Sequence, residues 1–224
     1  MPQNCKTLDE LWEFVYKLNK EHFPENKLMP ILGGGKIQKP KAMFVFINPT
    51  SRNISSDPSW KGQRFPFTGT KQIWNVFHKA GLFDDQLAYR IRYDAHWSVE
   101  FANKVIDYIK GKSFYFTNIV KWTGHNADLP DSKKTELFLP VLKREIELVQ
   151  PEYVVTFGLI PFEKLTGEKI RLSDYYSEAV KNKKLKSYEI EVNSVKTKVI
   201  PCYFPVGRGS PKKAVEILKL AGRL

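Results

Sequence analysis

Residues 42–50 read Ala-Met-Phe-Val-Phe-Ile-Asn-Pro-Thr, an apolar run that ends in a single amide and a proline. An unbroken apolar run of this length predicts a buried strand of an α/β sheet. Pro49 has no amide hydrogen and turns the chain away from the sheet, so it presents Asn48 at the end of that strand. Ligands of open α/β sheets bind at the carboxyl ends of the strands. Asn48 is therefore the first candidate functional residue.

Two further apolar runs, 114–120 and 152–158, predict buried strands that alternate with helices. This order is typical of a mostly parallel sheet, and we expect a three-layer α/β/α sandwich, a four-stranded sheet and one domain over 1–224. A hairpin over 187–200 should turn at Asn193-Ser194. Gly33-Gly34-Gly35 lacks the ending of a P-loop and favours a flexible turn. Helices are predicted at 7–20, 72–80, 98–110, 132–148, 158–166 and 211–221.

The composition indicates a basic globular protein. The 224 residues hold 36 Lys and Arg against 24 Asp and Glu, a net charge of +12. Such a surplus is typical of a polyanion-binding protein, and equally of a well-solvated surface. Cys5 and Cys202 are too few for a disulfide framework or a four-cysteine metal site, which indicates a reducing compartment. We expect a monomeric, soluble, intracellular protein without a membrane partner, cytoplasmic or, in a eukaryote, nuclear.

Two more side chains are candidates for ligand binding. Asn118 lies near the end of the second predicted strand, where its amide suits the polar edge of a nucleobase or merely caps the strand. Phe67, in a long loop held by Pro66 and Gly69, could stack on a base or anchor that loop in the core. The four histidines show no metal-ligand spacing, so no metal is expected.

A glycine-rich loop precedes the last predicted helix. Residues 204–213 read Phe-Pro-Val-Gly-Arg-Gly-Ser-Pro-Lys-Lys and combine glycines, a hydroxyl and cations at a helix start. Amide protons and the helix dipole there suit a phosphate group, although an ordinary basic helix start has the same composition.

In their order and spacing, these segments resemble the uracil-DNA glycosylase superfamily over about 30–220. Residues 46–50 resemble its first motif in the Asn-Pro form, 66–69 its base-stacking segment, and 116–121 the strand whose asparagine reads uracil. The resemblance implies that Asn48 positions the attacking water. It implies base contacts by Ile47, Phe67, Asn118 and Phe204, and DNA contacts by Pro49, Thr50, Lys121, Gly207, Arg208, Gly209, Ser210 and Lys212.

The implied activity is hydrolysis of the N-glycosidic bond of uracil, or of a related deaminated or mismatched base, after base flipping, as the first step of base excision repair in DNA. No cofactor is expected, because Trp122 replaces a cysteine of the iron-sulfur branch. Phe46 replaces a common glycine, and Phe204 replaces the histidine of the second motif. The missing histidine leaves a non-catalytic nucleic-acid-binding protein as the alternative. An enzyme acting on free nucleotides is a more distant one.

Overall fold

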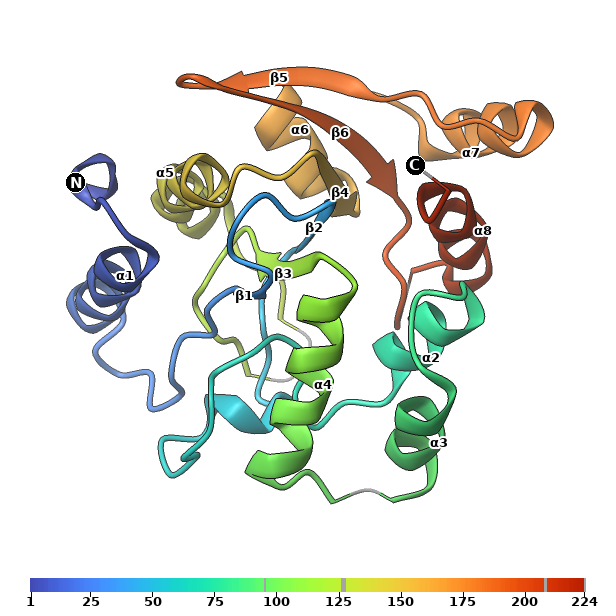
Figure 1. Cartoon of the computed structure of the whole chain (residues 1–224). Coiled ribbons are helices and arrows are strands. Elements are labelled where there is room, and N and C mark those ends of the chain that lie inside the picture. Colours follow the sequence, from blue (N-terminus) through green and yellow to red (C-terminus); the bar gives the residue numbers. More distant parts are fainter. Residues whose placement is uncertain (95, 126–127, 208, 224) are drawn as a thin grey trace.

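The computed structural model describes residues 1–94, 96–125, 128–207 and 209–223 (Figure 1). Its centre is one mixed sheet with the strand order β1-β3-β2-β4-β6-β5. The strands span β1 (Gly34–Gly35), β2 (Ala42–Phe46), β3 (Phe114–Asn118), β4 (Tyr153–Phe157), β5 (Tyr188–Val192) and β6 (Val195–Cys202).

The four inner strands β3, β2, β4 and β6 are parallel, whereas β1 and β5 pair antiparallel at the two edges. The expected four-stranded sheet is thus wrong in number, because the edge strand β1 was not predicted and the hairpin strand β5 joins the sheet as its other edge. Two glycines of the predicted flexible turn form β1 instead. The predicted hairpin is confirmed: β5 and β6 turn at Asn193, which has a φ of 54°, and they cross the top of Figure 1.

Alternate side chains of β2 enter two different hydrophobic clusters, so helices cover both faces of the sheet. Phe44 and Phe46 pack with residues of α2, α3, α4, α7 and α8. Met43 and Val45 pack with residues of α1, α5 and α6. These helices span α1 (Leu8–His22), α2 (Gln72–Lys79), α3 (Asp85–Tyr93), α4 (Val99–Gly111), α5 (Ser132–Val149), α6 (Leu159–Thr166), α7 (Leu172–Asn182) and α8 (Pro211–Ala221).

Side-chain caps explain where several helices begin. Thr7, Asp84, Ser98 and Asp131 each accept a hydrogen bond from a backbone N–H in the first turn of α1, α3, α4 and α5. The six predicted helices are present within a few residues of their expected bounds. The sequence patterns did not predict α3 and α7, which are short and mostly exposed. Among the described residues, no helix has the length and apolar character needed to span a membrane.

Candidate functional site

The carboxyl ends of β2 and β3 lie side by side and bring the predicted site residue Asn118 next to Phe46, which was not predicted as a site residue. Phe46 and Asn118 are register partners on these parallel strands, so their side chains leave the same face of the sheet. The pairing continues past the strand ends, because Ile119 N–H donates to the Phe46 carbonyl at 2.8 Å and Val120 N–H donates to that of Ile47 at 2.9 Å.

Asn118 carries a buried amide without a partner. Its side chain is 1% exposed, and neither Nδ2 nor Oδ1 makes a hydrogen bond within the described part of the chain. Leaving such a group unpaired costs about 1–3 kcal/mol, so proteins rarely keep one without a reason. The amide offers a donor and an acceptor side by side, which fits a ligand edge carrying the complementary pair.

Aromatic rings surround the position next to Asn118. The Phe46 ring is fully buried, stacks on Phe157 at 4.3 Å between centroids, and meets the edge of Phe67 at 4.5 Å. Phe67 itself is only partly buried and has a φ of 66°, and its carbonyl accepts a hydrogen bond from Trp74 Nε1 at 3.1 Å. Phe46 therefore connects the strand position beside Asn118 to the Phe67 ring.

Asn48 is half-buried, and its amide is held against the segment that follows β3. Its Nδ2 donates to the Pro49 carbonyl at 3.0 Å and to the Asp128 carbonyl at 3.1 Å, while the described residues provide no donor to Oδ1. Gly124 allows this approach, because a Cβ there would lie 3.3 Å from Nδ2. Thr50 forms a bridge to Gly124, and Pro49 is buried. Asn48 is thus oriented with a free acceptor atom.

Lys121 does not lie where the sequence analysis placed it. Its ammonium is fully buried, bonds Glu145 Oε2 at 2.5 Å, and also donates to the Asn118 carbonyl at 2.7 Å. Thr117 and Tyr115 donate to the same carboxylate at 2.9 and 2.8 Å. Desolvation lowers the pKa of Lys121, and the Glu145 charge acts in the opposite direction. The expectation that Lys121 contacts DNA is corrected, because a DNA phosphate cannot reach it.

The loop after β6 leaves the same edge of the sheet. Phe204 is half-buried against the cluster that also receives Phe67, and its carbonyl accepts a hydrogen bond from Ser210 N–H at 3.0 Å. The hydroxyl of Ser210 does not cap α8. Gly207 and Lys212 are exposed, whereas Arg208 lies outside the described residues. The loop therefore offers a hydroxyl and a cation at the start of α8.

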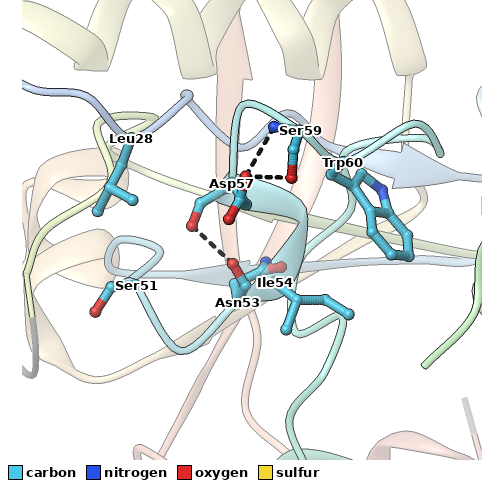
Figure 2. Close-up of a pocket in the computed structure, with 8 residues that line it drawn as sticks. Leu28, Ser51, Asn53, Ile54, Asp57, Ser59 and Trp60 are labelled. Carbon is cyan, nitrogen blue, oxygen red and sulfur yellow. Dashed lines mark hydrogen bonds between the residues drawn. The ribbon is translucent and has the colours of Figure 1, made fainter. Parts of the chain in front are cut away.

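A separate cavity of about 300 Å³ lies in the long segment that follows Asn48 (Figure 2). Asp57 stands in its wall and accepts hydrogen bonds from the Ser59 backbone and hydroxyl, which lower the pKa of the carboxyl. This negative charge disfavours a phosphate. The cavity includes none of the predicted site residues; it is lined by Leu28, Ser51, Asn53, Ile54, Ser56, Asp57, Ser59 and Trp60.

Comparison with known protein families shows the family of this chain. The family model of the uracil DNA glycosylase superfamily matches residues 32–219, most of the chain. The chain belongs to the uracil DNA glycosylase superfamily. A search of curated proteins gives no significant match. Superfamily membership suggests a glycosylase that acts on DNA.

Sequence reasoning missed two features of this superfamily member. Phe46 was noted only as a departure, yet its ring lies between Phe67 and Phe157. Glu145 was not singled out, although it is a charged residue on the apolar face of α5, a pattern that signals a buried partner. Among the described residues, no cluster of three or more histidine, cysteine or carboxylate side chains is arranged to hold a metal ion.

Proposed function

We propose that this protein is a DNA glycosylase that hydrolyses the N-glycosidic bond of uracil or a related deaminated base and so initiates base excision repair. The observation that supports the proposal is the buried, unpartnered amide of Asn118 on the strand next to Phe46, whose ring in turn contacts Phe67. A flipped base would satisfy both amide atoms and would stack on an aromatic side chain, two contacts by which enzymes hold an extruded base.

The chemistry of the Asn118 amide fits deaminated bases as a class. Uracil and hypoxanthine both present a carbonyl oxygen next to a ring N–H. The amide can donate to the first through Nδ2 and accept from the second through Oδ1. Cytosine and adenine present the reverse pair and would require the amide to be turned over. The orientation that Asn118 adopts in the complex therefore contributes to the choice of base.

In the proposed reaction the bond between the sugar C1′ and the base nitrogen breaks, and the base leaves with the electron pair. A water oxygen bonds to C1′ and loses its proton to solvent. The free Oδ1 of Asn48 would orient that water, because a neutral amide can accept a hydrogen bond but cannot take up the proton. Backbone amides near Ile47 and the loop after β6 would stabilise the charge of the leaving base.

The proposed DNA contacts follow from the same edge of the sheet. The start of α8, with Gly207, Gly209, Ser210 and Lys212, would hold a phosphate next to the flipped nucleotide. Thr50, which is half-buried, would face the DNA strand that carries the flipped nucleotide, whereas the buried Pro49 would shape the turn behind it. The phenylalanine at position 204 favours one second candidate, a DNA-binding protein without glycosylase activity, since no imidazole is available there to stabilise the departing base.

The test is a panel of oligonucleotides that carry uracil, hypoxanthine or mismatched thymine, with alkaline cleavage of abasic sites as the readout. Wild-type protein should release base in at least one lane. Asn48→Ala should lower the rate at saturating DNA by at least about 100-fold. Asn103→Ala, an exposed asparagine of α4, is the matched control and should leave the rate unchanged. DNA binding without release in any lane would reject the enzyme in favour of the binding protein.

A further inference from the structure

The two most exposed aromatic side chains in the described part of the chain both lie on helix α3. Tyr89 and Tyr93 are 67% and 66% exposed, and their ring centroids are 4.7 Å apart. They lie four residues apart, on the face opposite to the buried Ala88 and Ile91. Adjacent exposed aromatic rings are unusual on a monomer and indicate a binding surface.

Cationic side chains lie near the Tyr93 end of this tyrosine pair. The guanidinium of Arg92 lies 6.0 Å from the Tyr93 ring and donates to Asn75 on α2 at 2.5 Å. Arg90 is also exposed, and it pairs with Asp94 at 3.5 Å. Lys71 is exposed and donates to the Arg92 carbonyl at 3.1 Å. Arg90 is neutralised by Asp94, and Asp85 at the start of α3 pairs with His78 of α2 at 2.7 Å. Arg92 and Lys71 are therefore the cations that remain beside the rings without a carboxylate partner among the described residues.

The tyrosine pair lies on a helix that is anchored next to the base-stacking segment. Lys71, which bonds the end of α3, immediately precedes α2, and only three residues separate it from Phe67. Trp74 of α2 bonds the Phe67 carbonyl at the same time. Helices α2 and α3 lie side by side at the lower right of Figure 1. A DNA strand that enters the site thus has α3 as a neighbouring surface.

We propose that Tyr89 and Tyr93, with Arg92 and Lys71, form a stacking surface for unpaired bases of single-stranded DNA next to the target nucleotide. Exposed rings bind the faces of bases, which are accessible in a single strand and covered by stacking in a duplex. The cations meet the phosphates between those bases. The inference rests on the proposed function only in taking DNA as the partner, since stacking here needs no excision.

The test measures binding of the full-length protein to a fluorescein-labelled single strand that contains no uracil or other lesion, by anisotropy. Tyr89→Ala/Tyr93→Ala should weaken binding about tenfold or more, because two base contacts are lost. The slope of log affinity against log salt should stay that of the wild type, since no cation is removed. Tyr89→Phe/Tyr93→Phe keeps both rings and should restore the affinity.

Controls separate this surface from the other possible occupants. Ile37→Ala removes an exposed apolar side chain from the segment before β2 and should change nothing. A blunt duplex of the same sequence should bind the double alanine variant within about twofold of wild type. The proposal is overturned if the double alanine variant binds the single strand with wild-type affinity. It is also overturned if this variant loses as much affinity for the duplex as for the single strand. So would a wild-type dimer that this variant converts to a monomer.

The two proposals can also fail independently. If no lesion is excised but single-strand binding still depends on the tyrosine pair, the glycosylase activity is rejected and the stacking surface stands. If the protein releases a base in the lesion panel but the double alanine variant binds the single strand with wild-type affinity, the stacking surface is rejected and the glycosylase activity stands.

Discussion

At the residue scale, some of the buried polar side chains around β3 have hydrogen-bond partners and others have none. Lys121, Glu145, Thr117 and Tyr115 satisfy one another, and Lys121 also fixes the backbone carbonyl of Asn118. A buried ion pair of this kind adds little net stability, but loss of one partner is expensive. Among the described residues, both polar atoms of the Asn118 side chain are left without a partner, as is the Trp122 Nε1.

Asn118→Leu should therefore make the protein more stable and inactive. Leucine has nearly the shape of asparagine, and the substitution removes the unpaired amide, so the free energy of unfolding in urea should rise by about 1–3 kcal/mol. Base release should be lost. Thr117→Val is the contrasting variant: it removes a donor to Glu145 and should lower stability by a similar amount. A less stable Asn118→Leu protein would mean that the amide is satisfied without a ligand.

At the scale of elements, one tight turn fixes the loop between β6 and α8. A Cβ on Gly209 would lie 1.8 Å from the Phe204 carbonyl oxygen, which itself accepts the Ser210 N–H. Because the clash is with backbone, the loop cannot accommodate a side chain without moving. The start of α8 is thus positioned by a glycine whose role is steric.

Gly209→Ala should shift this loop, lower the free energy of unfolding by about 1–3 kcal/mol, and weaken DNA binding. Gly167→Asn, at the end of α6 and outside this loop, is the matched control, because a Cβ there meets nothing within 4 Å and asparagine tolerates the φ of 74°. Urea denaturation and DNA anisotropy should separate the two variants. Identical behaviour of both would show that the turn has no part in DNA binding.

At the scale of the whole molecule, the burial of thiol and phenol groups predicts that the protein loses stability at alkaline pH. In the folded state the pKa of the Cys202 thiol and the pKa of the Tyr115 and Tyr175 hydroxyls are raised, mainly because burial removes these groups from water. A group whose folded pKa is raised loses its stabilising effect as pH rises from the unfolded to the folded pKa. The lowered pKa of Lys121 has the opposite sign and offsets part of this loss.

The thiol should titrate first, because an unfolded cysteine has a pKa of about 8.5. The free energy of unfolding should accordingly fall between about pH 8.5 and 10. Cys202→Ala should reduce that slope by up to about 1.4 kcal/mol per pH unit and leave the slope between pH 6 and 8 as in wild type. Parallel curves for the two proteins above pH 9 would contradict this origin of the effect.

Much of this protein follows from the sequence alone. The buried strand over 42–47, the alternation of strands with helices, the hairpin at Asn193 and the family motifs depend on local periodicity, turn residues and order along the chain. For the same reason Asn48 and Asn118 could be placed at the carboxyl ends of neighbouring strands. Local patterns specify which segments form and which residues end them.

Only the tertiary structure decided which polar groups are paired. The sequence places Lys121 three residues after Asn118, as expected of a DNA-contacting cation, yet in the fold it is fully buried and pairs with Glu145, 24 residues later. The Gly34–Gly35 strand likewise exists because β3 provides its partner. Desolvation and hydrogen bonding act between residues distant in sequence, so burial of Lys121 and the unpaired amide of Asn118 emerge only when the chain is folded.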